Sequence, residues 1–468
     1  MKKLIYILLL TVIFFNAKSQ LPYSEVQFQY DSIMDVPYGT ATDYVENLVT
    51  LKMDIYKPIN DDNCLRPIII FVHGGSWIAG SKEDPNLVYL SREYARRGYV
   101  VANINYRLGT HKTSNYAMYA LCNTDISAPC TYICDSSEII RANYRGMQDT
   151  KAAIRFMKNR HTQDSTDINN VFVAGESAGA FIALATAFTY NETMKPSDCY
   201  AIADAPTPDS DLITYGCIPT LLNLKRPDLG SVEGELNTGI YNSEVQGVGS
   251  FYGGVFDLSI FDPSSFQKPV YIFHQGSDVI VNYQYGRLLG RISWECYQQS
   301  NICQPYYFYP SAYGGESMRN YLSNLGESPP VFTADIIYNS DYLNNCFSNG
   351  HSIDNIQIRS QNMANLFADK IALSSNNPET NCASLSSEFH LNNPEIQLYP
   401  NPANNLITVK SVAKLSGALY EIYDVTSKII SSGFIESENF TINTSAFPEG
   451  IYFFKTGKNT NLSFQIIR

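Results

Sequence analysis

Residues 171–188 read VFVAGESAGAFIALATAF, a β-branched run that passes through GESAG into an alanine-rich segment. This pattern predicts a strand, a sharp turn and a helix over Ala178–Thr189. Gly175 and Gly179 lack side chains, so the turn can be tight enough to lift the hydroxyl of Ser177 clear of its neighbours. The helix start also directs free N–H groups toward that hydroxyl. The stretch therefore indicates a nucleophilic serine and acyl-transfer chemistry.

A second motif, HGGSW at residues 73–77, lies about a hundred residues upstream of Ser177. It directly follows Pro67–Val72, an apolar run typical of a buried strand. Its two glycines allow backbone N–H groups to turn inward, as the donors of an oxyanion hole must. The chain thus holds two half-sites of a serine hydrolase in a consistent order.

With these two motifs, residues 40–372 resemble the serine esterases and carboxylesterases of the α/β-hydrolase fold that carry an HGG loop and a GESAG elbow. The resemblance implies an α/β fold with a mostly parallel central sheet and lid insertions. It also implies that the N–H groups of Gly74, Gly75 and Ala178 form the oxyanion hole. By the same resemblance, His73 is structural and is not the catalytic base.

Further patterns along the chain agree with this fold class. Tyr99–Tyr106 reads as a strand, and Asp149–Lys158 reads as the helix before the nucleophile strand. Residues near 190–245 and 300–345 are long, polar and rich in tyrosine, and we expect lid or specificity loops there.

The triad of the resembling family runs in the order serine, acid, histidine. Asp278 follows the apolar run Pro269–Phe273 and is the best candidate for the acid, with Asp257 or Asp262 as alternatives. The chain has six histidines, and His351 stands in a Gly-His loop directly before a helical pattern. That is where the family keeps its base, so the predicted triad is Ser177, Asp278 and His351.

These roles predict a secreted esterase that cleaves a small-molecule or polysaccharide ester through an acyl-enzyme on Ser177. Two alternatives remain open. One is a prolyl-type serine peptidase of the same fold, and the other is a non-catalytic binding protein on a hydrolase scaffold. The HGGSW loop and the lack of an upstream repeat array favour the ester. The full set of site residues favours catalysis.

Composition excludes several other partners. Of 468 residues, 17% are charged, and the net charge of −12 disfavours nucleic acid and anionic membrane surfaces. The sequence has no phosphate-binding GxxxxGK[ST] loop, no HExxH pair and no paired CxxC motifs, so we expect no cofactor and no metal. An acidic cluster is better explained as a solvated loop than as a metal site, and it comprises Asp204, Asp209 and Asp211.

The N-terminus reads as an export signal, predicted to cover residues 1–19. Lys2 and Lys3 precede the apolar run Leu4–Phe15, and small residues follow at the positions that a signal peptidase reads. That run is too short to cross a bilayer, and no other stretch reaches the necessary length. Export makes disulfides plausible for the ten cysteines. The easiest bridges are Cys296–Cys303 and Cys199–Cys217, with Cys122 meeting Cys130 or Cys134.

The composition changes after the predicted catalytic domain, residues 20–372. Residues 373–394 are rich in Ser, Asn and Pro and read as a linker. Residues 395–468 hold six short alternating segments, which predict a small β-sandwich. Their start, IQLYPNPA at 396–403, resembles the C-terminal sorting domain of the type IX secretion pathway of certain Gram-negative bacteria. The resemblance implies contact with the secretion machinery and a secreted or cell-surface location.

Overall fold

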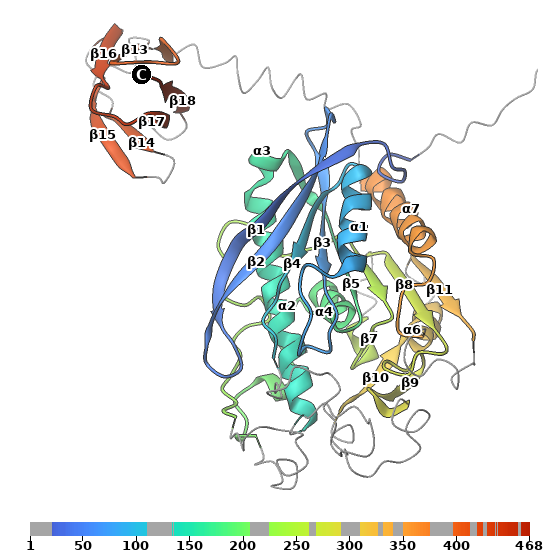
Figure 1. Cartoon of the computed structure of the whole chain (residues 1–468). Helices are drawn as coiled ribbons and strands as arrows, with labels where there is room; N and C mark the ends of the chain where they lie inside the picture. The colour runs from blue at the N-terminus through green and yellow to red at the C-terminus, as the bar shows by residue number, and fades with distance from the viewer. Residues whose placement is uncertain are drawn as a thin grey trace, which may run out of the picture. The chain divides into compact units, whose positions relative to one another are not determined.

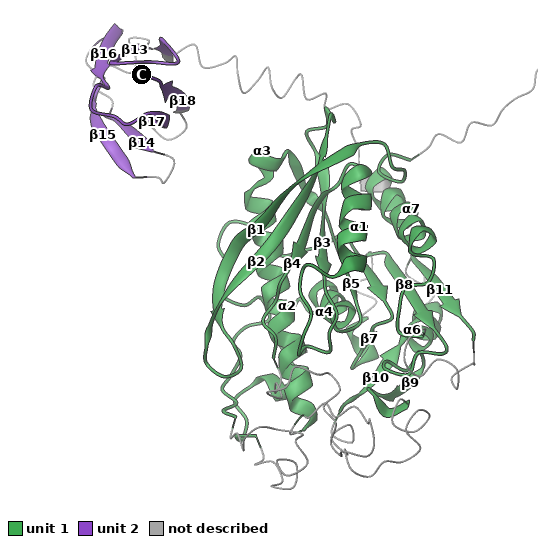
Figure 2. Cartoon of the chain, viewed as in Figure 1, with its two compact units in different colours: residues 1–378 green, residues 379–468 purple. Residues whose placement is uncertain are grey.

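The computed structural model describes most of the chain. The residues described are 21–109, 133, 135–205, 224–261, 268–291, 309–325, 331–339, 350–374, 396–411, 419–424, 428–435, 437, 439–456 and 460–468. The predicted signal peptide, Asp209, Asp211, Asp262 and all but the first two residues of the predicted linker lie outside this set. The chain divides into two compact units, residues 1–378 and 379–468 (Figure 2).

The first unit is built on an eight-stranded sheet in the order β1-β2-β4-β3-β5-β6-β8-β11 (Figure 1). β1 and β2 pair antiparallel, and so do β2 and β4. All other pairs of neighbouring strands in this sheet are parallel. The prediction of a mostly parallel central sheet is therefore confirmed. The strands are β1 (Gln29–Thr42), β2 (Leu48–Ile59), β3 (Arg66–Val72), β4 (Val100–Ile104), β5 (Thr166–Glu176), β6 (Gly247–Phe251), β8 (Val270–Gln275) and β11 (Phe332–Ile337).

Helices cover both faces of this sheet. Successive side chains of β3 point to opposite faces, and each face has its own apolar core. Ile68 and Ile70 belong to a core shared with α2 (Ser136–Asn159), α4 (Ala178–Phe188) and α6 (Gly315–Ser323). Ile69 and Phe71 belong to a second core shared with α1 (Pro85–Arg96) and α7 (Ile356–Ser374). Because both faces are buried, the central strands are continuous apolar runs. The remaining elements of the unit are α3 (His161–Asp164), three 3₁₀ turns (Glu192–Met194, Ser197–Cys199, Leu258–Ile260) and a small sheet of β7 (Gly254–Val255), β10 (Ser311–Gly314) and β9 (Tyr285–Arg287).

Two predictions within this unit need correction. The helix predicted at Asp149–Lys158 is the C-terminal part of α2, which begins at Ser136 because Asp135 caps it by accepting the N–H of Ser137. The described part of the predicted lid at 300–345 is not a loop, because it forms β10, α6 and β11. Many buried polar side chains interrupt the apolar pattern of α2, and the buried Glu316 lies in the first turn of α6.

The second unit consists of two antiparallel sheets that share one apolar core. One sheet holds β12 (Ile396–Tyr399), β13 (Leu406–Ser411) and β16 (Asn439–Asn443), and the other holds β15 (Ile429–Phe434), β14 (Leu419–Asp424), β17 (Gly450–Thr456) and β18 (Thr460–Ile466). Buried residues from both sheets, such as Val409 and Phe454, meet in this core. The predicted β-sandwich is therefore confirmed.

Candidate active site

The GESAG turn places Ser177 in a strained backbone conformation between β5 and α4. Its φ of 50° and ψ of −123° lie in a region that residues with side chains rarely adopt. The flanking glycines make the turn possible. A Cβ on Gly175 would lie 2.3 Å from the carbonyl oxygen of Gly179, and one on Gly179 would lie 2.1 Å from that of Val72. The sharp turn holds the serine hydroxyl at the C-terminal end of the parallel strands.

The structure brings together the three side chains that the sequence singled out. His351 lies in the loop before α7, and its Nε2 is 2.8 Å from Oγ of Ser177. Its Nδ1 is 2.8 Å from Oδ2 of Asp278, in the turn after β8. With Nδ1–H donating to the carboxylate, Nε2 is free to accept the serine proton. Asp257, the alternative acid, instead caps a 3₁₀ turn by accepting the N–H of Ser259.

Asp278 is fully buried and its carboxylate accepts four hydrogen bonds. Oδ1 accepts the N–H groups of Ile280 and Val281, at 2.8 and 2.9 Å. Oδ2 faces His351 and also His274, whose Nε2 is 3.2 Å away. Burial by itself raises the pKa of Asp278, but the two histidines outweigh it and lower the pKa to about 2. The group is therefore ionised throughout the neutral range.

His274 is a supporting residue that the sequence analysis missed. It is completely buried, and its Nδ1 accepts the N–H of Gly315 at 3.0 Å. The proton must then sit on Nε2, which donates to the carbonyl of Val281 and to Asp278. The four-residue spacing between His274 and Asp278 in HQGSD was the available signal, because the turn after β8 brings the two side chains together.

The HGGSW loop lies against the serine turn. A Cβ on Gly74 would lie 3.0 Å from Cβ of Ser177, and Gly75 has a φ of 106° that favours glycine. In the described part of the chain, the N–H groups of Gly74, Gly75 and Ala178 donate to no protein acceptor. The N–H of Ser177 is already used by the carbonyl of Phe251, at 2.9 Å. The three free N–H groups are those that the sequence analysis assigned to the oxyanion hole.

The side chains of His73 and Tyr106 contact the backbone of this loop. Burial lowers the pKa of His73 to about 4, so the ring is neutral, and its Nδ1 lies 2.7 Å from the carbonyl of Gly74. Tyr106 stacks on the ring of His73 at 4.4 Å and donates to the His73 carbonyl. These contacts fit a structural role for His73.

Glu176, directly before the serine, lies in a polar cluster on the far side of the turn. The hydroxyl of Tyr252 donates a hydrogen bond to the carboxyl group of Glu176. The side-chain amide of Asn86 donates a second one, with 3.3 Å between its nitrogen and the carboxyl oxygen. Burial, and then the charge of Asp84, raises the pKa of Glu176 to about 7. The ring of Tyr252 also packs edge-to-face on His351, with centroids 4.7 Å apart. Nothing in the sequence pointed to Tyr252.

A cavity of about 640 Å³ is lined by residues of α2 and α4 and by the segments that follow α4 and β6. Phe181, one helical turn after Ser177, lines it together with Tyr144, Met147 and Phe256, and Asn191 and Lys195 also contribute to the lining. The ring of Phe181 also packs against Trp77 of the HGGSW loop. The cavity therefore combines aromatic and aliphatic walls with polar groups, and Ser177 is not among its described lining residues.

In the described ranges, no group of His, Cys, Asp and Glu could hold a metal ion, and Asp204 of the acidic cluster pairs with Lys225. No helix in the described part of the chain has the length and apolar character of a bilayer-spanning segment. Cys64 is disulfide-bonded, whereas Cys199 is a buried free thiol. The predicted Cys199–Cys217 bridge is therefore wrong, because Cys199 packs in an apolar cluster with Tyr144, Met147 and Val232.

Two family models match parts of the chain. The model named BD-FAE matches residues 53–144, and the Secretion system C-terminal sorting domain matches residues 397–467. The first covers the HGGSW loop and the first part of α2, and the second covers almost all of the C-terminal β-sandwich.

Several curated proteins match a shorter stretch. The isoprenylcysteine alpha-carbonyl methylesterase ICME of Arabidopsis thaliana is 30% identical over 132 residues, which is 28% of this chain and 23% of that protein. Gut esterase 1 of Caenorhabditis elegans is 25% identical over 130 residues, 28% of this chain and 19% of that protein. The match thus spans about a fifth of the length of these relatives.

Solved esterase structures match over a longer range. Esterase 2 of Thermogutta terrifontis with bound butyrate has 15% identity and a TM-score of 0.37, over 72% of this chain and 96% of that chain. A truncated carbohydrate esterase from gut microbiota has 15% identity and a TM-score of 0.38, over 75% of this chain and 100% of that chain.

Proposed function

We propose that the chain is an exported serine esterase with Ser177 as nucleophile, His351 as base, and Asp278 as the acid that orients the histidine. The observation that carries this proposal is the hydrogen-bonded line from Ser177 Oγ through the imidazole to Asp278, with 2.8 Å at each step. The esterase names of the relatives and the sorting-domain match support it further.

In this mechanism His351 removes the serine proton as Oγ attacks the ester carbonyl. The N–H groups of Gly74, Gly75 and Ala178 stabilise the oxyanion that forms. His351 then protonates the departing alcohol, and an acyl-enzyme remains on Ser177. Water activated by the same histidine hydrolyses that intermediate.

The substrate is proposed to be a small-molecule or polysaccharide ester with an apolar acyl or alcohol group. The cavity beside Phe181 and Phe256 would take that group, because its lining combines aromatic walls with polar residues such as Asn191.

The test is hydrolysis of a panel of esters by the mature protein beside Ser177→Ala. The panel contains nitrophenyl esters of increasing chain length, acetylated xylan and feruloyl esters. We expect at least one ester to be cleaved, and kcat to fall about a thousandfold or more in Ser177→Ala. Cleavage of dipeptide amides but of no ester would establish the peptidase alternative. Undiminished turnover in Ser177→Ala would refute the nucleophile assignment.

A further inference from the structure

A second cavity, of about 820 Å³, lies away from the proposed triad. Its walls are the end of the β1–β2 hairpin at 40–48, one side of α2, and the segment 225–236. Ser177, Asp278, His351 and the oxyanion glycines are not among its described lining residues. Three arginines are, and they are Arg107, Arg141 and Arg145.

Arg145 is a buried cation without a carboxylate partner. Its residue exposure is only 6%, and in the described structure its single hydrogen bond runs from a terminal nitrogen to the carbonyl of Gly109, at 3.0 Å. Its Nε has no partner. Burial, together with the charges of Arg107 and Arg141, lowers the pKa of Arg145 to about 10. The side chain therefore stays charged at neutral pH.

Arg141 lies one helical turn before Arg145 and also lacks a carboxylate partner in the described chain. It donates to the carbonyls of Asp198, Tyr200 and Pro227, and no carboxylate in the described chain lies within ion-pair distance of it. Backbone carbonyls satisfy its donors but do not neutralise its charge. Two buried positive charges thus stand side by side on α2.

Several other buried cations on α2 and around it do have acidic partners. Arg107 forms a bidentate pair with Asp149, and Lys151 and Arg155 share Glu233. A buried charge without a counter-ion is costly, because the interior solvates it poorly.

In the described chain, Lys158 of the same helix has no carboxylate partner either, but its ammonium donates to the side chain of Asn242 and to the carbonyl of Glu244. Nε of Arg145, by contrast, has no acceptor among the described residues. The unpaired arginines therefore suggest a counter-ion that comes from outside the chain.

The acidic residues that line the cavity do not cancel this charge. Asp149 is held by Arg107, and Asp228 by Lys195 at 2.6 Å. Glu46 and Glu235 are exposed, so water screens them, whereas Arg145 is buried where its field is stronger. Asp43 also lines the cavity; it is half-buried, and its carboxylate accepts the backbone N–H groups of Val45 and Asn47.

We infer that this cavity binds a small oxyanion, a carboxylate, sulfate or phosphate group, through the guanidinium groups of Arg145 and Arg141. The planar fork of a guanidinium donates two parallel hydrogen bonds to such groups. The cavity is much larger than one ion, so the oxyanion can be carried on a sugar or another organic molecule.

The test measures binding without turnover, so its result is independent of the proposed esterase activity. Thermal shift and calorimetry are performed with sodium phosphate, sulfate, acetate and glucuronate, each against sodium chloride at equal ionic strength. We expect saturable binding of at least one oxyanion beyond the chloride effect. Phosphate and sulfate are tetrahedral, whereas acetate and glucuronate carry a planar carboxylate, so the panel shows which kind of oxyanion the site prefers. A preference for either kind supports the site.

Arg145→Gln should weaken this binding by about tenfold or more, because it removes the unpaired charge. Arg145→Lys keeps the positive charge but not the planar guanidinium, so its loss of anion binding should be smaller than that of Arg145→Gln. It also serves as a second test if Arg145→Gln does not fold. The matched control is Lys158→Gln, which removes another buried cation of α2 about 20 Å along the helix. Absence of saturable binding in the wild type, or equal binding in Arg145→Gln and wild type, would overturn the inference.

Discussion

Asp278 fixes the direction of every hydrogen bond in the proposed triad. Its Oδ1 is occupied by two backbone N–H groups, so Oδ2 alone is left for His351 and His274. Both of these ring nitrogens must donate to it. The lowered pKa, about 2, keeps the carboxylate ionised, and so available as an acceptor, at neutral pH. Its contribution to stability is present above the unfolded pKa of about 4 and is lost only as the pH falls toward 2.

Asp278→Asn should therefore lower kcat by roughly ten-thousandfold while the chain remains folded. With the amide oxygen held by Ile280 and Val281, the amide nitrogen faces His351 and presents a donor. The imidazole would then have to carry its proton on Nε2, where it cannot accept from Ser177. Steady-state kinetics at pH 7–8 measure the loss, and circular dichroism reports the fold.

Asp257→Asn is the matched control, since Asp257 was the alternative acid. Its carboxylate caps a short turn, so we expect kcat within about twofold of wild type. A large loss in Asp257→Asn combined with an active Asp278→Asn would contradict the assignment.

Glu176 makes a second residue-scale prediction, which concerns pH. Its raised pKa, about 7, means that the folded state binds a proton that the unfolded state releases near pH 4.3. Stability from this group is thus greatest at low pH and declines as the pH rises from about 4 to about 7. Glu176→Gln should therefore be tolerated better at pH 8 than at pH 5. Chemical denaturation at both values measures this, and a mutational cost independent of pH would contradict the raised pKa.

The sequence identified the residues of the proposed site that sit on short motifs. Ser177 is recognisable because the glycines on either side of it are required by close backbone contacts. In the HGGSW loop, Gly75 is required by its positive φ and Gly74 by its close approach to Ser177. His274 and Tyr252 were missed because their roles depend on long-range contacts, with Gly315 in one case and with Glu176 and His351 in the other. The four-residue spacing to Asp278 was the local signal for His274, whereas the contacts of Tyr252 leave no local pattern in the chain.

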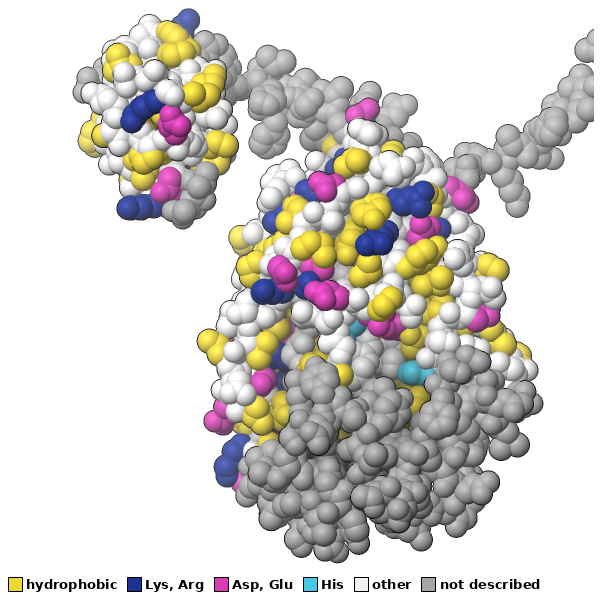
Figure 3. All heavy atoms as spheres, viewed as in Figure 1, with side chains coloured by type: hydrophobic (Ala, Val, Ile, Leu, Met, Phe, Trp, Pro, Cys, Tyr) yellow, Lys and Arg dark blue, Asp and Glu magenta, His cyan; other side chains and the backbone are white. Residues whose placement is uncertain are grey.

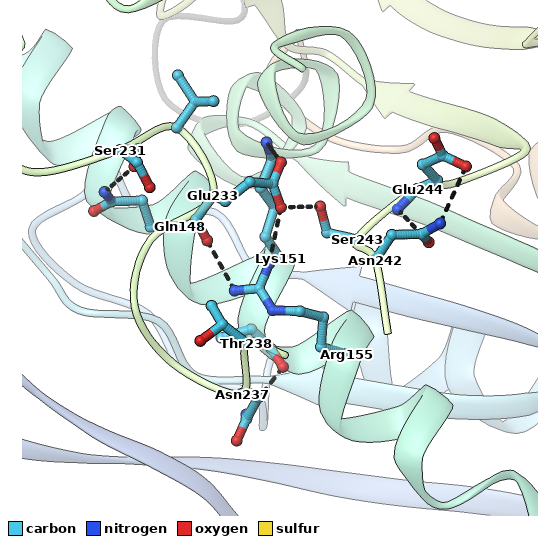
Figure 4. A network of polar contacts seen from close by, with 12 residues as sticks. Gln148, Lys151, Arg155, Ser231, Glu233, Asn237, Thr238, Asn242, Ser243 and Glu244 are labelled. Carbon is cyan, nitrogen blue, oxygen red and sulfur yellow. Dashed lines mark hydrogen bonds and ion pairs between the residues drawn. The ribbon is translucent and has the colours of Figure 1, made fainter. Parts of the chain in front are cut away.

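At the scale of elements, α2 acts as the anchor for the long segment between α4 and β6. Figure 4 shows Lys151 and Arg155 of α2 converging on Glu233, with Ser243 on the same carboxylate. Arg155 also donates to the carbonyls of Glu233 and Leu236. Glu233 thus serves two buried cations of α2, and the carbonyls of Leu229 and Ser231 in the same segment also accept from Gln148 of that helix.

Glu233→Gln should destabilise the catalytic unit by about 1–2 kcal/mol. Breaking a fully buried ion pair costs about 3–5 kcal/mol, and the estimate is reduced because the Glu233 side chain is 43% exposed. Denaturant unfolding gives the change in free energy. The control is Asp204→Asn, which breaks an exposed pair with Lys225 and should cost less than about 0.5 kcal/mol. Equal costs for the two variants would show that Glu233 is not an anchor.

The same helix shows where the fold could not be read from the sequence. Only its C-terminal part was predicted, because Arg141, Arg145, Gln148 and Asp149 interrupt the apolar stripe. These polar side chains are buried by the hairpin and by segment 225–236, and that packing is set by tertiary structure. The buried strands β3, β5 and β8 were readable, since each is a continuous apolar run.

At the scale of the whole molecule, the two units have separate apolar cores. The clusters on the two faces of the large sheet contain only residues of the first unit, and the core of the β-sandwich contains only residues of the second. Folding of the first should therefore not require the second.

A chain that ends at residue 378 should keep its thermal midpoint and its kcat/KM within about twofold of the full chain when assayed in vitro, because its cores remain complete. In cells that export the full chain by the type IX pathway, the same truncation should abolish its arrival at the surface, since the match to a sorting domain lies in the removed part. Phe454→Ala in the full chain is the matched test, because Phe454 is completely buried in the sandwich and its loss should cost about 3–5 kcal/mol there. That variant should impair surface delivery while hydrolysis by the purified protein is unchanged. If either change removed hydrolysis in vitro, the catalytic unit would depend on the sandwich, and the separation of the two cores would not describe how the molecule works.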